Sequence, residues 1–342
     1  MKAVLIDKFC DTLNEVRVSE VPSPEATGDN ILIRVRGVGV NYVDTLYARG
    51  KHQNNKRHVT PPFILGLEFA GIVIAAPADS EFQKGDAVFG DHAGAYSEVI
   101  SIPREQIPSL LHVPEGWPVE AAAGLAATLP VAYDGLVGAG RLRAGETVLV
   151  HAAAGGLGVM ACQIAASRGC RVIGTAGSDA KCKYAKGYGA SECINYTTDA
   201  QWWDKVNSMT GGRGVDVVFD PVGLVGPSLK CMAAKGRIVV VGFAGLDGNF
   251  ENIAMNRILL KQVELIGYRF GQTLRDNPGK RAEIWEQLYP MLEYLSIKPT
   301  LSVMYEGLES VPRALMDISE RKIFGKAVVR PATGSSFSVP RL

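Results

Sequence analysis

The stretch ETVLVHAAAGGLGVMACQIAASR, residues 146–168, decides the fold of this chain of 342 residues. Its first part, Val148-Leu149-Val150, is apolar and β-branched, which is typical of a buried strand. A turn of small residues follows over 152–158, and the apolar residues after it recur at helical spacing. A strand, a glycine-rich turn and a helix in this order predict the first unit of a dinucleotide-binding fold.

The glycines of this turn have separate predicted roles. Gly155 and Gly156 allow the backbone to approach a pyrophosphate, whose negative charge is stabilised by the helix N-terminus. Gly158 allows the helix to pack closely on the strand. The usual G-x-G-x-x-G fingerprint has a glycine where this chain has Ala153, so the motif alone leaves an ordinary strand–helix turn as an alternative.

The end of the next predicted strand, 171–175, indicates which coenzyme the fold would hold. It lies roughly 20 residues after the turn, where a ribose-binding acidic residue is expected for NAD(H). No acidic residue ends the strand; Ser178 and Lys181 follow it instead, which favours a 2′-phosphate and therefore NADP(H). Asp179 leaves an alternative, in which Ser178 and Asp179 only cap a helix.

Composition and charge exclude several classes of protein. The net charge is +1, without a long run of like charges, which argues against nucleic acid or a membrane surface as the main partner. No apolar run has membrane-spanning length, and the first residues, MKAVLIDKFCD, resemble a strand rather than a signal peptide. The six cysteines are scattered and form no C-x-x-C, which predicts a reduced, intracellular protein.

The rest of the chain predicts two domains. Residues 1–125 are rich in short strands separated by Pro, Gly and Asp, which indicates a small barrel-like β domain. A helical segment over 121–138 leads into strands that alternate with helices up to a sixth strand at 263–268, and this alternation predicts a parallel, doubly wound sheet. We therefore expect a nucleotide-binding domain over 126–271 and a β domain completed by 272–342.

Eight stretches carry a resemblance to a known family, in the order and spacing of that family: residues 39–50, 62–73, 82–90, 94–99, 148–165, 189–196, 213–223 and 256–271. Together they resemble the medium-chain dehydrogenase/reductase superfamily, and within it the zinc-free quinone oxidoreductase (zeta-crystallin-like) branch. The resemblance implies a Rossmann domain with a doubly wound parallel sheet, plus an N-terminal GroES-like β-barrel domain that the C-terminus completes.

The same resemblance predicts that no metal is bound. Zinc alcohol dehydrogenases of this superfamily carry a catalytic cysteine early in the chain, a Gly-His-Glu motif and a lobe with four cysteines. Here the motif is Gly66-Leu67-Glu68, and the four-cysteine lobe is absent. The five histidines do not assemble a zinc site with other ligands, so Glu68 is expected to be structural.

The resemblance also implies cofactor-binding residues. The pyrophosphate turn is matched by Ala154, Gly155, Gly156, Leu157 and Gly158. The 2′-phosphate end is matched by Ser178, Lys181 and Tyr196, and the nicotinamide end by Phe243, Ala244, Phe270 and Gly271. Arg321 and Lys326 occupy places where the family often has basic residues near the cofactor, with a solvated helix end as the alternative.

Three residues are candidates on the substrate side. The amide of Asn41 can donate to a developing enolate or quinone oxygen without titrating. Asp44 is expected to orient that loop or to hold Asn41, with a buried cap as the alternative. Tyr133 is a candidate neighbour of the nicotinamide ring, although aromatic residues at helical spacing also occur in cores.

These features predict NADPH-dependent hydride transfer across an interdomain cleft to a flat, electron-poor substrate. A quinone is the first choice, an enone, 2-alkenal or enoyl substrate is the alternative, and a low-turnover NADPH-binding protein with an RNA-binding or structural role is a third hypothesis. An edge strand at 263–268 can pair with that of a second copy, and the resemblance to the family implies that this pairing makes a homodimer. We expect a cytoplasmic location, although Pro340-Arg341-Leu342 distantly resembles a peroxisomal signal.

Overall fold

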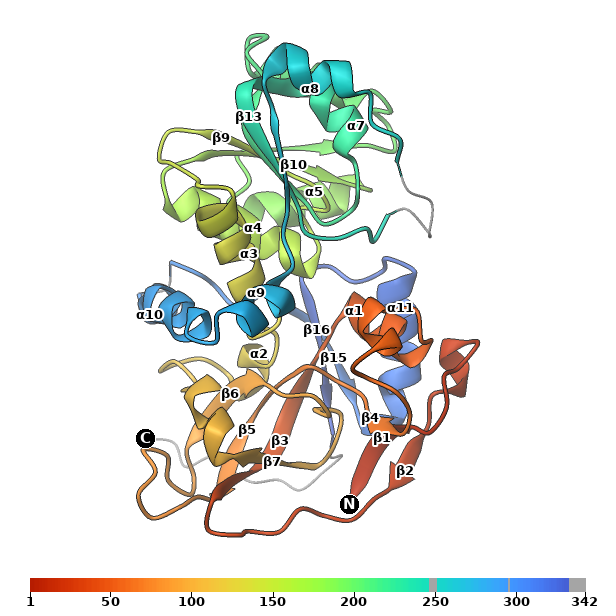
Figure 1. The fold of residues 1–342 in the computed structure, drawn as a ribbon, viewed down its shortest axis with the longest axis vertical. Helices are drawn as coiled ribbons and strands as arrows, with labels where there is room; N and C mark the ends of the chain where they lie inside the picture. Colours follow the sequence, from red (N-terminus) through yellow and green to blue (C-terminus); the bar gives the residue numbers. More distant parts are fainter. Residues whose placement is uncertain (246–250, 295, 332–342) are drawn as a thin grey trace. The chain divides into compact units, whose positions relative to one another are not determined.

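The structure, a computed structural model, describes residues 1–245, 251–294 and 296–331 (Figure 1). The chain divides into two compact units. The first contains Met1–Ala127 and the residues from Leu301 onward, and the second is Thr128–Thr300. Neither boundary cuts through a helix or a strand. The second unit begins just before α3 (Leu129–Tyr133), and the first unit resumes at β15 (Leu301–Glu306).

The second of these boundaries differs from the expected one at residue 272. Residues 272–300 stay with the second unit because α10 (Lys280–Glu293) contacts α3 and buries an apolar face. The backbone N–H of Lys298 also donates to Gln163 Oε1 at 2.7 Å, which ties the segment to α4 (Gly156–Ser167). Helical periodicity alone did not indicate which unit this segment joins.

A six-stranded parallel sheet forms the centre of the second unit. Its strands are β9 (Thr147–Val150), β10 (Arg171–Ala176), β11 (Glu192–Asn195), β12 (Val215–Asp220), β13 (Met232–Val240) and β14 (Glu264–Gly267). They lie in the order β11-β10-β9-β12-β13-β14, with every neighbouring pair parallel. This is the strand order of a doubly wound dinucleotide-binding fold, and it confirms the predicted fold class.

The helices of the second unit connect these strands (Figure 1). Besides α3, α4 and α10 they are α5 (Asp179–Gly187), α6 (Trp202–Met209), α7 (Val225–Ser228) with a 3-10 turn over Leu229–Cys231, α8 (Met255–Lys261) and α9 (Phe270–Asp276). The helical segment expected over 121–138 is not one continuous helix. Instead α2 (Val119–Ala122) ends in turns, α3 begins with Pro130 in its first turn, and a π-helical turn follows over Asp134–Ala139.

The first unit is built on antiparallel strands. A three-stranded sheet contains β1 (Lys2–Ile6), β2 (Val18–Glu20) and β4 (Phe63–Ile64). A seven-stranded sheet contains β3 (Asn30–Val40), β5 (Glu68–Ala75), β6 (Ala87–Asp91), β7 (Val99–Pro103), β8 (Leu110–His112), β15 and β16 (Lys326–Arg330). The α-helices here are α1 (Tyr42–Ala48), α2 and α11 (Val311–Ser319), with 3-10 turns over Leu13–Glu15, Gln53–Lys56, Arg104–Ser109 and Leu308–Ser310.

The strand β16 lies between β15 and β3 in this larger sheet. It pairs antiparallel with β3, so that Ala327 lies opposite Val40 and Val328 opposite Gly39. On its other side it pairs parallel with β15. This register brings Lys326 next to Asn41, the residue at which α1 begins, although 285 positions separate the two in the chain.

Candidate functional site

The glycine turn lies between β9 and α4, as predicted. Ala152 has a left-handed φ of 49°, and its carbonyl oxygen points at the first turn of the helix. A Cβ atom on Gly158 would lie 2.1 Å from that oxygen, so only glycine allows the helix to approach the turn this closely. Gly155 is the extended N-cap of α4, and no side chain caps the helix. The uncapped N–H groups at this helix N-terminus suit a pyrophosphate.

The end of β10 carries the residues expected at the 2′-phosphate. Ser178 is the N-cap of α5, and its side-chain oxygen accepts a hydrogen bond from Lys181 N at 3.2 Å. The carboxylate of Asp179 accepts from Asn195 Nδ2 at 2.9 Å, on the neighbouring strand β11. Asp179 is therefore directed toward β11, and because its donor is a neutral amide, its negative charge stays in place next to Ser178.

Tyr196 lies beside the same strand end. A Cβ atom on Gly177 would come within 2.7 Å of Tyr196 Oη, so the phenol occupies the space in front of this glycine. The ring of Tyr196 is 37% exposed. Gly177 is not among the residues predicted from the sequence, because its only signal there is its place directly after β10.

The residues expected at the nicotinamide end lie in two other segments of the second unit. Strand β13 ends at Val240, so Phe243 and Ala244 lie in the loop after it. The N–H of Ala244 donates to Pro221 O at 3.2 Å, which joins this loop to the one after β12. Phe270 and Gly271 form the first turn of α9.

A buried carboxylate holds the chain just before α9. Asp134 accepts a hydrogen bond from the Tyr268 hydroxyl at 2.7 Å and lies 3.5 Å from Lys280 Nζ. The neighbouring Tyr133 is only 8% exposed, which suits a core side chain as well as a site residue. Asp134 itself was not among the predicted residues, because a single aspartate in an apolar helical segment gives no signal in the sequence.

The two substrate-side candidates of the first unit lie in a buried network. Glu68 Oε1 accepts from Asn41 Nδ2 at 2.8 Å and from Lys326 Nζ at 2.7 Å, while Oε2 accepts from Ala127 N at 2.8 Å. The side chains of Glu68 and Lys326 are 0% and 3% exposed. Gly39 is required beside them, because a Cβ atom there would lie too close to the Glu68 carboxylate.

Two predicted roles change because of this network. Asn41 Nδ2 donates its two hydrogens to Glu68 and to Gly39 O, so the predicted donation from Asn41 to a substrate oxygen is not available in this arrangement. Lys326 Nζ donates to Glu68, to Asn41 Oδ1 at 2.9 Å and to Val40 O at 3.2 Å. These three contacts use the three donors of an ammonium group, so the predicted cofactor contact of Lys326 is not available either.

Asp44 is fully buried one turn into α1. Its Oδ2 accepts from Asn41 N at 2.9 Å and from the Tyr96 hydroxyl at 3.2 Å. Its Oδ1 is buried without a hydrogen-bond partner in the structure. Burial, opposed by the Asn41 N–H and by Lys326, raises the pKa of Asp44 to about 7. Asp44 therefore holds Asn41 through its backbone as part of a capping box, which fits the alternative of a buried cap as well.

The remaining basic candidate, Arg321, follows the last turn of α11 in the first unit. It is exposed and has a left-handed φ of 59°. The glycine turn belongs to the second unit, and so do Ser178 and Lys181. The geometry of either unit alone thus gives Arg321 no cofactor role.

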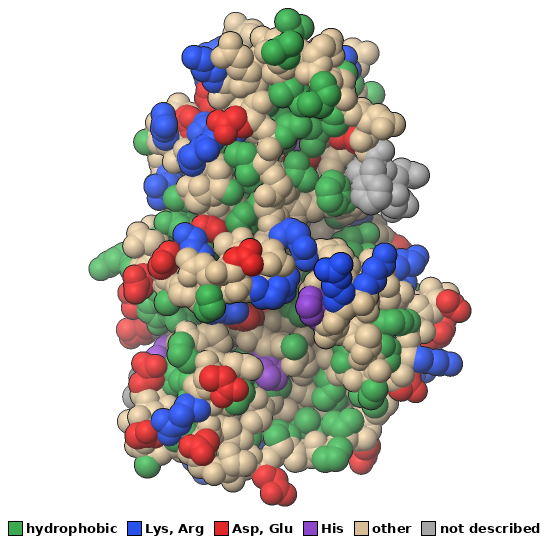
Figure 2. Space-filling model, in the orientation of Figure 1, with side chains coloured by type: hydrophobic (Ala, Val, Ile, Leu, Met, Phe, Trp, Pro, Cys, Tyr) green, Lys and Arg blue, Asp and Glu red, His purple; other side chains and the backbone are tan. Residues whose placement is uncertain are grey.

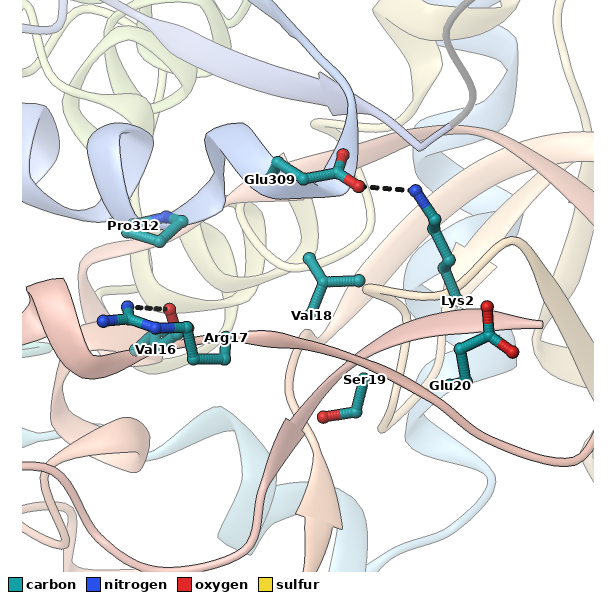
Figure 3. Close-up of a pocket in the computed structure, with 8 residues that line it drawn as sticks. All are labelled: Lys2, Val16, Arg17, Val18, Ser19, Glu20, Glu309 and Pro312. Atoms are coloured by element: carbon teal, nitrogen blue, oxygen red, sulfur yellow. Dashed lines mark hydrogen bonds and ion pairs between the residues drawn. The ribbon is translucent and has the colours of Figure 1, made fainter.

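Two other features bear on the site. Across 1–245, 251–294 and 296–331, no group of three or more His, Cys, Asp or Glu side chains is arranged to hold a metal ion. A cavity of about 370 Å³ lies in the first unit, where Lys2 and Glu309 form an ion pair of 2.7 Å (Figure 3). Its lining contains none of the predicted site residues: Lys2, Val16, Arg17, Val18, Ser19, Glu20, Glu309 and Pro312.

Comparisons with known proteins agree with this geometry. The family model described as "Zinc-binding dehydrogenase" matches residues 156–291, and the "Alcohol dehydrogenase GroES-like domain" model matches residues 27–115. The chain is 33% identical over 332 residues to quinone oxidoreductase-like protein 2 of Rattus norvegicus, covering 94% of this chain and 90% of that protein.

Solved structures extend the similarity to the arrangement of the backbone. A mycobacterial protein complexed with NADPH matches with a TM-score of 0.84 and 28% identity, covering 97% of this chain and 100% of that one. The quinone oxidoreductase of Escherichia coli complexed with NADPH matches with a TM-score of 0.82 and 25% identity, with the same coverage. Both N-terminal and C-terminal parts of the chain are included in these matches.

Proposed function

Because the chain belongs to the medium-chain dehydrogenase/reductase superfamily, with quinone oxidoreductase-like proteins among its relatives, we propose that it is an NADPH-dependent quinone reductase that acts without a metal. Membership of this superfamily indicates an oxidoreductase. The proposed coenzyme and acceptor rest on the site described above.

The observation that carries the coenzyme proposal is the uncapped glycine turn next to a strand end without a free acidic residue. The N-terminus of α4 offers backbone N–H groups to a pyrophosphate. Ser178 and Lys181 follow the end of β10, where we expect the 2′-phosphate, and Asp179 accepts a hydrogen bond from Asn195. Two structural neighbours are NADPH complexes, which supports the same choice.

The acceptor proposal rests on chemistry that needs no Lewis acid. When bound, NADPH supplies a hydride, and a quinone accepts it at a conjugated system that is already electron-poor. The donors of Asn41 are used internally, and Glu68 is neutralised by Lys326, so the first unit presents no metal ligand set at this place. The residues of the chain therefore bind and orient NADPH and the quinone. We expect the substrate oxygen to take its proton from solvent.

The test measures NADPH consumption by the purified protein with a para-quinone, an ortho-quinone and a simple enone, and repeats each reaction with NADH. We expect turnover with a quinone and much less with NADH. Turnover with the enone alone would move the protein to the enone or enoyl reductases. NADPH binding without turnover on any acceptor would refute the enzymatic proposal and favour the low-turnover alternative, in which case salt-dependent RNA retention is the next measurement.

We also propose a homodimer formed through β14. In the described part of the chain, β14 is paired only on its β13 side. The adjacent surface is apolar, with Met255, Leu259, Leu260 and Leu265 exposed by 69%, 76%, 78% and 41%. Figure 2 shows apolar side chains gathered over α8, where three of these residues lie. An unpaired edge beside an apolar patch suits pairing with a second copy.

Light scattering on the double variant L259K/L260K tests the dimer. We expect wild-type protein to have the mass of a dimer and this variant that of a monomer. Tyr294→Lys is the matched control, because Tyr294 is 80% exposed on another helix end. A monomeric wild type, or a variant that stays dimeric, would contradict the proposal.

We further propose a cytosolic location, which the six free thiols support.

A further inference from the structure

His151 is the most buried titratable group beside the glycine turn, and nothing in the proposed reaction uses it. It follows β9 directly and is 0% exposed. Its backbone N–H donates to Phe219 O at 3.1 Å, and its ring packs edge-on against Trp202 with 4.9 Å between centroids. Both ring nitrogens lie within hydrogen-bond distance of a hydroxyl group, one at the end of β10 and the other on α7.

The first partner is the end of β10. His151 Nδ1 lies 2.9 Å from the hydroxyl oxygen of Thr175. The carbonyl oxygen of Thr175 accepts from Ala153 N at 2.9 Å, so this one residue is held to the turn through both its side chain and its backbone. Ser178, at the proposed 2′-phosphate end, follows three positions later.

The second partner is α7, which follows β12. His151 Nε2 lies 2.8 Å from Ser228 Oγ, and Ser228 Oγ in turn donates to Leu224 O at 2.6 Å. The loop before Leu224 is fixed as well, because the carboxylate of Asp220 accepts from the N–H groups of residues 222, 223 and 224 at 2.9, 2.8 and 2.6 Å. His151 therefore joins an already rigid loop to the turn.

The pattern of donors assigns the tautomer. The single hydroxyl proton of Ser228 goes to Leu224 O, so Ser228 Oγ must accept from His151, and Nε2 carries the proton. Nδ1 is then the acceptor, and the Thr175 hydroxyl donates to it. Burial lowers the pKa of His151, opposed by the charge of Asp220, in keeping with a neutral ring.

We propose that His151, as a neutral imidazole with its proton on Nε2, is a positioning residue of the coenzyme site: it fixes the glycine turn relative to the strand end at Thr175 and to α7 at Ser228. This inference rests on the proposed NADPH binding. His151 does not touch the coenzyme in this role. It acts by keeping Ala152 and Ala153 in the conformation that lets the backbone meet a pyrophosphate, which reduces the ordering needed on binding.

The first measurement is the dissociation constant of NADPH for full-length variants. H151F removes both hydrogen bonds while keeping a ring, and we expect it to raise Kd about tenfold. H151Q keeps a donor that can reach Ser228, so its Kd should lie between those of H151F and wild type. T175V and S228A each remove one partner and leave His151 in place, and each should raise Kd about threefold.

Val206→Ala is the matched control, because Val206 is 0% exposed in the core of the same unit and its apolar side chain makes no hydrogen bond to the turn. It should lower Tm without changing Kd. The proposal is overturned if H151F lowers Tm in the same way but leaves Kd within about twofold of wild type. Should H151F not fold, unchanged Kd values for both T175V and S228A would overturn it equally.

The second measurement is the ¹⁵N spectrum of the imidazole in wild-type protein at pH 7. We expect the His151 signal, assigned by its absence from the spectrum of H151Q, to be that of a neutral ring with Nε2 protonated, and a proton on Nδ1 would overturn the assignment. The two proposals fail in different ways. Wild-type protein that does not bind NADPH refutes the proposed function, whereas wild-type binding that the His151, Thr175 and Ser228 variants do not weaken refutes only the role of His151.

Discussion

The buried ion pair between Lys326 and Glu68 makes a sharp prediction for the variant Lys326→Met. The chain contains a comparison pair with the same separation, since Lys2 and Glu309 also have 2.7 Å between nitrogen and oxygen. The two pairs differ in burial. The side chains of Lys326 and Glu68 are 3% and 0% exposed, and those of Lys2 and Glu309 are 48% and 59% exposed.

The expected magnitude follows from what the substitution leaves behind. Without the ammonium group, the Glu68 carboxylate keeps its hydrogen bonds from Asn41 Nδ2 and Ala127 N but has no opposite charge beside it. Removing one partner of a buried pair costs about 3–5 kcal/mol of unfolding free energy. For a unit of this size, each kcal/mol shifts Tm by about 2–4 °C, so Lys326→Met should lower the Tm of the first unit by about 6–20 °C.

Differential scanning calorimetry of Lys326→Met and of the control Lys2→Met measures this difference. We expect little or no change in Tm for Lys2→Met, because a solvated pair contributes little. The double variant K326M/E68Q should be more stable than Lys326→Met alone, since the isolated charge is gone. If Lys326→Met and Lys2→Met had the same Tm, the buried pair between Lys326 and Glu68 would not stabilise the first unit.

Three further predictions follow from single residues. Burial raises the pKa of Asp44 to about 7, so its protonated form stabilises the fold at low pH and this contribution is lost as pH rises from about 4 through 7. The Tm of wild-type protein should therefore fall relative to that of D44N between about pH 4 and 7, and parallel curves would refute the reasoning. Gly158→Ala should weaken NADPH binding more than about tenfold, because its Cβ would meet Ala152 O at 2.1 Å, whereas Gly187→Ala, with open space around it, should bind normally in the same titration. Lys181→Ala should raise the Kd of NADPH about tenfold and leave that of NADH unchanged in paired titrations; an equal loss for both coenzymes would show that Lys181 does not distinguish them.

Most of the second unit could be predicted from the sequence because its signals are local. Strand β12 has such a local signal, because three valines and Phe219 follow one another closely in a short, largely buried run. The pattern of apolar residues did not predict the structure where contacts between distant segments determine it. The helix expected over 121–138 is interrupted, and α10 joins the second unit through contacts with α3 that periodicity does not encode.

The residues of the candidate site show the same difference between local and long-range signals. Ser178 and Lys181 could be found because they follow β10 directly in the chain. The role of Lys326 could not, because 258 positions separate it from Glu68 and only the register of β16 on β3 brings them together. The partners of His151 were hidden for the same reason, since Thr175 and Ser228 lie 24 and 77 positions away.

The network of the first unit gives a physical reason why Glu68 can persist without a metal beside it. Leu67 stands where zinc-dependent members of the superfamily have a histidine, so the neighbouring carboxylate needs another source of positive charge and of hydrogen-bond donors. Lys326 supplies the charge, and Asn41 and Ala127 supply the remaining donors. A carboxylate engaged in this way has little affinity left for a cation. Restoring a histidine at Leu67 alone should therefore not create a zinc site, because Lys326 already neutralises Glu68.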